Sequence, residues 1–148
     1  MNKLEINNFI QKLMDKTSRN ELDWKPAKEF FNEPSHGGGF AASELALYSC
    51  SEWSTLYTED SFYLQKNGQY LFLLHIDHES AKDGSVTESW GLYAILDLKD
   101  DLFVTIPDYH PANTDDRIKK ISDIIKKNNA ADEAKKEKRL LDFFNSII

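Results

Sequence analysis

The chain has a single cysteine, Cys50, among its 148 residues. One cysteine excludes an internal disulfide and a cysteine-rich zinc site. No apolar run approaches the length of a membrane span, and the first residues lack the basic and apolar regions of a secretory signal. These absences predict a cytoplasmic protein with no membrane association, and the length predicts a single domain over residues 1–148.

Motifs that bind cofactors or carry out catalysis are also scarce. The run Gly37-Gly38-Gly39 lacks the Lys-Ser/Thr pair of a phosphate-binding loop. No Gly-x-Ser-x-Gly sequence marks a nucleophilic serine, and a lone cysteine in a predicted strand, such as Cys50, is typical of a small buried side chain. The sequence therefore predicts no cofactor and favours a protein that is not an enzyme.

Basic residues are few in the middle of the chain. Residues 29–110 contain three Lys and fourteen Asp or Glu, a net charge of −11, while residues 1–28 and 111–148 each carry +2. Proteins that bind nucleic acids usually present a clustered basic face. We therefore expect no direct nucleic-acid binding, and an acidic surface on the region predicted to form a sheet.

The clearest pattern that is present is Asn67-Gly68 between two apolar runs. Both residues tolerate the positive φ angles of a type I′ turn, so the pattern predicts a tight β-hairpin over residues 61–76. Both faces of this hairpin are largely apolar, which predicts a central position in the sheet. The predicted register pairs Lys66 with Gln69, Leu64 with Leu71 and Phe62 with Leu73 on one face, and Tyr63 with Phe72 and Gln65 with Tyr70 on the other.

The remaining periodicity predicts an α+β fold. Apolar residues at helical spacing indicate an N-terminal helix over residues 2–17, and alternating residues indicate strands around 41–58, 90–98 and 102–106. Together with the hairpin, these strands form an antiparallel meander of four to five strands, with C-terminal helices packed on the sheet. We expect the C-terminal helix to begin at Asn113 or Thr114 and to be interrupted at Asn128-Asn129.

The end of the chain is strongly apolar, since Leu140 to Ile148 contains six large apolar residues. This end either docks on the sheet or contacts a partner. Docking is the preferred interpretation, because soluble proteins rarely expose large apolar patches.

The segment Asp15-Lys16-Thr17-Ser18-Arg19-Asn20-Glu21-Leu22-Asp23-Trp24 resembles a loose group of small bacterial and phage-borne proteins. These proteins have an N-terminal amphipathic helix, a Lys-Thr, a small or glycine-like turn and a Leu-x-Trp, followed by an antiparallel sheet and a C-terminal helix. Asn20 stands at the turn where the group has glycine. The resemblance implies this fold, a prokaryotic or mobile-element setting, and structural roles for Thr17 and Trp24. The group has no established activity, so the resemblance implies no catalytic residue.

The best candidate for chemistry is the set His75, Asp77 and His78. His75 and Asp77 project from one face of a strand, and His78 lies at its end, which gives nitrogen and oxygen ligands that suit zinc or manganese. The alternative function is therefore a metal-dependent hydrolase centred on these residues. The structural interpretation is a core histidine that is hydrogen-bonded to a neighbouring acid.

Three tyrosines are the candidates for partner binding. If one face of the sheet is open, Tyr63, Tyr70 and Tyr93 among acidic residues form a surface for a protein partner, since aromatic residues dominate binding energy at interfaces. The leading hypothesis is a non-enzymatic protein-binding module with an acidic sheet surface. The sequence determines neither the partner nor the oligomeric state.

Overall fold

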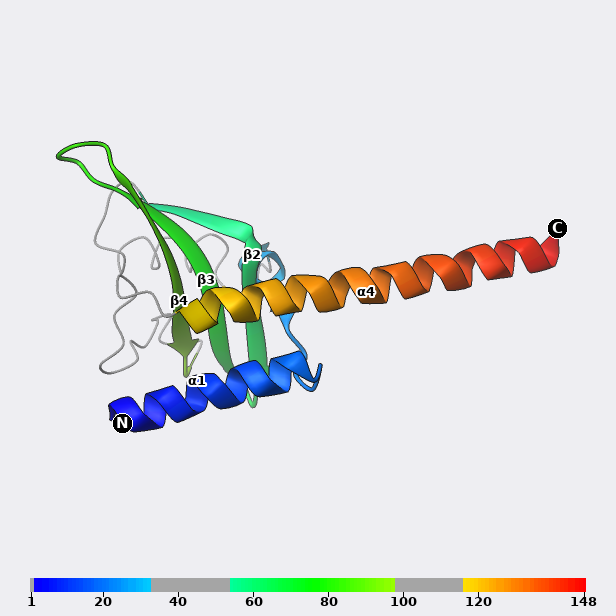
Figure 1. Cartoon of the computed structure of the whole chain (residues 1–148), viewed down its shortest axis with the longest axis horizontal. Coiled ribbons are helices and arrows are strands. Elements are labelled where there is room, and N and C mark those ends of the chain that lie inside the picture. Colours follow the sequence, from blue (N-terminus) through cyan, green and yellow to red (C-terminus); the bar gives the residue numbers. More distant parts are fainter. Residues whose placement is uncertain (1, 33–53, 98–115) are drawn as a thin grey trace.

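The computed structural model describes residues 2–32, 54–97 and 116–148 (Figure 1). These residues form an α+β fold with an N-terminal helix, an antiparallel sheet of four strands in the order β1-β2-β3-β4, and a long C-terminal helix. The elements are α1 (Lys3–Ser18), β1 (Lys25–Pro26), α2 (Ala27–Asn32), β2 (Ser54–Lys66), β3 (Gln69–Glu79), β4 (Val86–Ile95) and α4 (Asp116–Ile147).

The sheet of the described residues thus has four strands, the lower of the two expected numbers. The predicted strand at 102–106, most of the predicted strand at 41–58, and the predicted start of the C-terminal helix lie outside the described residues. β3 and β4 both extend further toward their connection than expected, which leaves a short turn at residues 80–85. Gly84 in this turn has a φ of 70°.

The β2–β3 hairpin has the register that the sequence predicts. The pairs run from Lys66 with Gln69 to Phe62 with Leu73, without a shift. Asn67 and Gly68 have φ angles of 54° and 74°, as a type I′ turn requires. The hairpin also provides the two central strands of the sheet, in agreement with its two apolar faces.

Gly68→Ala is expected to lower the free energy of unfolding by about 1–2 kcal/mol. Space is not the cause, because nothing lies within 4 Å of an added Cβ; the cost is that of a left-handed conformation for a residue with a side chain. Asn67→Gly is the control, since glycine keeps the positive φ and should change the stability little. Urea unfolding of both variants measures the difference, and equal stabilities would contradict the turn geometry.

The N-terminal helix α1 begins and ends as its sequence indicates. Asn2 caps it by accepting a hydrogen bond from the Glu5 backbone N–H at 2.9 Å. Beyond its last turn, Asn20 has a φ of 55°, a left-handed conformation that asparagine tolerates better than most residues. Ile6, Ile10 and Leu13 form its buried face.

Side chains from the two faces of the sheet enter two separate buried clusters. On the face that α1 and α4 share, the cluster consists of Ile6, Ile10, Leu13, Phe62, Leu73, Trp90, Leu92, Ile118, Ile121 and Ile125. On the other face it consists of Ala27, Phe30, Tyr63, Tyr70, Phe72, Leu74, Ile76, Tyr93 and Ile95. Successive residues of β3 alternate between the clusters, as the pleat of a strand requires.

The C-terminal helix α4 is continuous, so the predicted interruption at Asn128-Asn129 is wrong. Asparagine inside a helix costs only about 0.7 kcal/mol, and Asn128 Nδ2 here donates a hydrogen bond to the Thr17 carbonyl oxygen at 3.2 Å. This contact with the end of α1 stabilises the helix at the position where the sequence favours a break.

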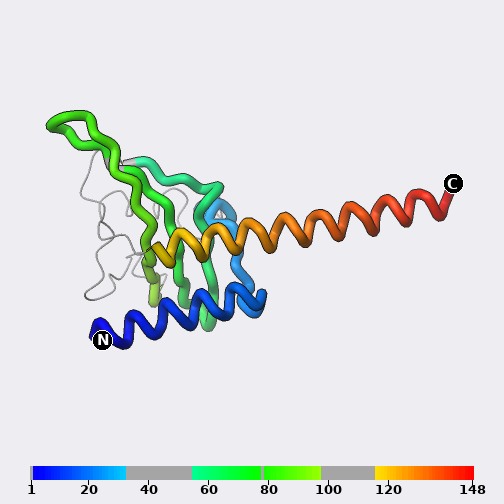
Figure 2. Tube along the Cα trace, in the orientation of Figure 1, coloured from blue at the N-terminus to red at the C-terminus, as the bar shows by residue number. Residues whose placement is uncertain are grey.

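Only the first part of α4 is buried in the fold. Ile118, Ile121, Ser122 and Ile125 are buried, whereas every residue from 129 to 148 is exposed. Figures 1 and 2 show this distal part, in orange and red, extending past the sheet and away from the other described elements. The apolar end therefore does not dock on the sheet, contrary to the preferred interpretation of the sequence.

Candidate functional site

The apolar end, residues 140–148, consists of the last eight residues of α4 and of Ile148, which follows the helix. Six large apolar side chains are exposed there, from 47% for Phe144 to 101% for Ile148: Leu140, Leu141, Phe143, Phe144, Ile147 and Ile148. Their spacing includes the i, i+3, i+4, i+7 pattern of a helix face that inserts into a groove. The apolar end thus has the form of a binding helix.

A charged stretch separates the apolar end from the body of the fold. Its basic residues are Lys135, Lys136, Lys138 and Arg139. Lys136 Nζ lies 3.5 Å from Glu133 Oε1, and both side chains are 74% exposed. Such exposed pairs contribute little to stability, so this stretch is a solvated spacer that holds the apolar end at a distance.

A second candidate site surrounds His75 of β3. The Nδ1 atom of its buried ring lies 3.0 Å from Asp60 Oδ2, and Nε2 lies 2.8 Å from Glu88 Oε1. The ring stacks on Trp90 with 3.9 Å between centroids and on Tyr57 with 4.7 Å. His75 is therefore clamped between two aromatic rings, with a carboxylate at each ring nitrogen.

The Asp60 carboxylate links this histidine to α4. Its Oδ1 atom lies 2.6 Å from Lys126 Nζ, while Oδ2 accepts the hydrogen bond from His75 Nδ1. Partial burial acts to raise the pKa of Asp60, but the hydrogen bonds from Lys126 and His75 outweigh it and hold the pKa below its ordinary value. Asp60 thus connects the sheet to the helix as an ionised group.

An irregularity in β2 places Asp60 at this position. Tyr57 pairs with His75, and the next pair along the strands is Phe62 with Leu73. β2 advances by five residues between these pairs and β3 by two, so β2 carries three extra residues within 58–61. Bulges of this kind redirect side chains and are common next to functional sites.

Hydrogen bonds fix the irregular segment on both sides. Ser61 Oγ accepts from the His75 backbone N–H at 3.0 Å and donates to the Tyr57 carbonyl oxygen at 2.7 Å. Ser122 Oγ of α4 donates to the Asp60 carbonyl oxygen at 3.0 Å. Hydrogen bonds therefore join the bulge both to β3 and to the first part of α4.

The predicted set His75, Asp77 and His78 is brought together only in part. His75 Nε2 lies 3.5 Å from Asp77 Oδ1 on the same face of β3, whereas nothing is described of the His78 side chain. A hydrogen bond with Asp77 raises the pKa of Tyr57. Asp77 therefore also contacts one of the two aromatic rings that stack on His75. Among the described residues, no three or more His, Cys, Asp or Glu side chains are grouped to hold a metal ion. The metal-dependent hydrolase stays a prediction.

Sequence reasoning identified His75 and Asp77 but missed their neighbours Asp60 and Glu88. A regular hairpin register would not bring Asp60 next to His75. The carboxylate reaches the histidine because Asp60 lies in the bulge of β2. Glu88 could have been found from a β3–β4 register, since Asp77 pairs with Glu88 across the strands.

The three tyrosines proposed for partner binding are all buried. Tyr63, Tyr70 and Tyr93 are each 6% exposed and pack in the cluster that contains Phe30 of α2. Burial raises the pKa of Tyr93 to about 12. Partner binding through these tyrosines requires an open sheet face, but the face on which they lie is covered.

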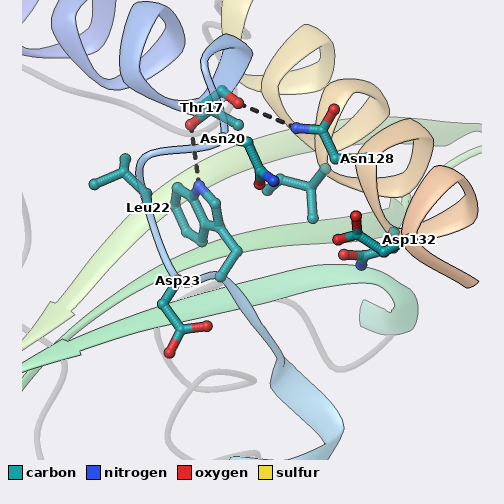
Figure 3. Close-up of a pocket in the computed structure, with 9 residues that line it drawn as sticks. Thr17, Asn20, Leu22, Asp23, Asn128 and Asp132 are labelled. Carbon is teal, nitrogen blue, oxygen red and sulfur yellow. Dashed lines mark hydrogen bonds between the residues drawn. The ribbon is translucent and has the colours of Figure 1, made fainter. Parts of the chain in front are cut away.

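A small cavity lies where the end of α1 meets α4 (Figure 3). Trp24 Nε1 donates a hydrogen bond to Thr17 Oγ1 at 3.0 Å, and Thr17 Oγ1 donates to the Leu13 carbonyl oxygen at 2.7 Å. The cavity has a volume of about 110 Å³ and is lined by Thr17, Asn20, Leu22, Asp23, Trp24, Ile125, Asn128, Asn129 and Asp132. It has space for a few water molecules. Thr17 and Trp24 thus join the end of α1 to the segment that precedes β1.

Comparison of the chain with protein-family models, curated proteins and solved structures found no match. In the described parts of the chain, none of the helices has the length and apolar character needed to cross a bilayer.

Proposed function

We propose that the protein is a non-enzymatic protein-binding module that presents the apolar end of α4 to a partner. The observation that carries this proposal is the exposure of six large apolar side chains within nine residues, eight of which belong to α4. An aromatic side chain has a surface of about 150–250 Å², and Leu and Ile are smaller, so the six exposed fractions together amount to at most roughly 700 Å². The largest apolar patch of a typical monomer is about 300–600 Å².

The anchoring of α4 supports the same function. Its first part is held by buried isoleucines, by the ion pair between Lys126 and Asp60, and by the hydrogen bond from Asn128 to Thr17. Arg117 Nη2 adds a hydrogen bond to Asn7 Oδ1 of α1 at 2.8 Å. A helix that is already formed and oriented loses less conformational entropy on binding than a disordered segment.

The acidic sheet region is a second part of the proposal. Glu59, Glu79, Asp83 and Glu88 are exposed on the described strands and turn. A contact through these carboxylates weakens as the salt concentration rises, because salt screens exposed charges. A contact through the apolar end is much less sensitive to salt, so the two surfaces can be distinguished. The cytoplasmic location and the bacterial or phage setting stay predictions.

The double variant Leu140→Ser/Phe144→Ser tests the proposal. Immobilised wild-type protein is expected to retain a partner from an extract of the source cells, and the purified partner should bind the double variant about 100-fold more weakly. Leu4→Ser/Phe9→Ser is the matched control, because it removes the same residue types from exposed positions of α1. Binding is measured by calorimetry at low and high salt. Equal affinity of the three proteins would contradict a role for the apolar end.

A further inference from the structure

We propose that the partner of the apolar end is a second copy of this chain. In this arrangement, which rests on the proposed function above, two α4 helices pack apolar end against apolar end and run antiparallel. The two chains are then related by a two-fold axis, and each contributes the same surface to the interface, as in most homodimers.

The size of the surface fits a stable dimer. If the second copy covered them completely, the six exposed apolar side chains would bury at most roughly 700 Å² per chain, which approaches the area of about 800 Å² that a standard interface buries on each partner. Within residues 140–148 only Asp142, Asn145 and Ser146 are polar, so a second apolar end leaves few polar groups to pair. Two apolar ends can therefore pack against each other without opposite charges to pair.

The charges of α4 favour the antiparallel direction. Four basic residues lie between 135 and 139, next to the single acid Glu137. A parallel pair would place the two basic stretches side by side, where their like charges repel each other. In the antiparallel pair each basic stretch lies beyond the apolar end of the other helix, at opposite ends of the interface.

The exposed length of α4 leaves room for this pairing. At a rise of roughly 1.5 Å per residue, the overlap of residues 140–148 is about 13 Å long. Residues 129–139 of each chain, all exposed, then separate the interface from each sheet by about 16 Å. Phe144, at the middle of the overlap, lies closest to the two-fold axis.

Analytical ultracentrifugation of the purified full chain tests the proposal. Wild type and the control Leu4→Ser/Phe9→Ser are expected to reach twice the mass of one chain by about 100 μM, whereas Leu140→Ser/Phe144→Ser should stay monomeric to at least tenfold higher concentration. Circular dichroism shows whether each variant is folded. A wild type that remains monomeric at the highest concentration, or a folded double variant that still forms dimers, would overturn the second-copy proposal.

Disulfide formation tests the direction of the helices. In a Cys50→Ser background, a mixture of Leu140→Cys chains and Ile147→Cys chains is expected to form mixed disulfides between the two variants. Self-pairing of each variant without mixed pairs would overturn the antiparallel arrangement, because parallel helices bring identical positions together.

Two further outcomes separate this inference from the proposed function. If wild type is monomeric but a different protein binds it through the apolar end, the second-copy proposal fails and the protein-binding function stands. If monomeric wild type instead sediments with vesicles of phosphatidylcholine and phosphatidylglycerol, and the double variant does not, both fail in favour of a lipid surface.

Discussion

Phe72→Ala is expected to lower the free energy of unfolding by about 3–5 kcal/mol. Phe72 of β3 is 0% exposed and occupies the middle of the aromatic cluster on the α2 face of the sheet. Its ring centroid lies 4.8 Å from that of Phe30 and 5.8 Å from that of Tyr63. Truncation removes these contacts and leaves a cavity that neighbouring strands cannot close without disrupting the sheet.

Phe9→Ala is the control for this variant, because Phe9 is 42% exposed on α1. Phe9→Ala should lower the free energy of unfolding by less than about 1 kcal/mol. Chemical denaturation followed by circular dichroism measures both values. Similar losses for the two variants would contradict the central position of Phe72 in the core.

Asp60→Asn is expected to lower the free energy of unfolding by about 2 kcal/mol at pH 7. The neutral amide cannot form the ion pair with Lys126 and no longer offers two oxygens to Lys126 and His75. Asp123→Asn is the control, since Asp123 Oδ1 lies 3.9 Å from the same lysine nitrogen and is largely exposed. Asp123→Asn should lower the free energy of unfolding by less than about 0.5 kcal/mol.

The effect of Asp60→Asn should depend on pH in one direction. Because folding lowers the pKa of Asp60, its ionised form stabilises the native state at pH values above the ordinary pKa of 3.8. This stabilisation is lost as the pH falls through the lower pKa of the folded state. Wild type and variant should therefore converge in stability as the pH falls below 3.8 and through the lower pKa of the folded state. A difference that grows on acidification would contradict the linkage.

Local signals explain why the hairpin and α1 could be predicted from the sequence. Asn67-Gly68 fixes both the turn and the register, since the two strands are adjacent in the chain. Asn2, Asn20 and the apolar spacing of α1 likewise act within a few residues. These elements depend little on the remainder of the fold, so their prediction needed no tertiary information.

Long-range contacts explain what the sequence could not predict. Asp60 and Lys126 are 66 positions apart, and a bulge of β2 brings the carboxylate to His75. The strand pattern around Tyr63 does not reveal that Phe30 of α2 covers that face. Similarly, the apolar end could be expected to dock on the sheet, but α4 is continuous through Asn128 and residues 129–148 are exposed.

α4 is one continuous helix from Asp116 to Ile147, and it places the apolar end away from the sheet (Figure 1). Spin labels at Lys119→Cys and Ser146→Cys, in a Cys50→Ser background and diluted with unlabelled protein, test it by pulsed electron resonance. A continuous helix predicts a narrow distance distribution near 40 Å, at a rise of roughly 1.5 Å per residue. A distribution centred below about 25 Å would mean that the helix breaks and its end folds back, and would contradict the account.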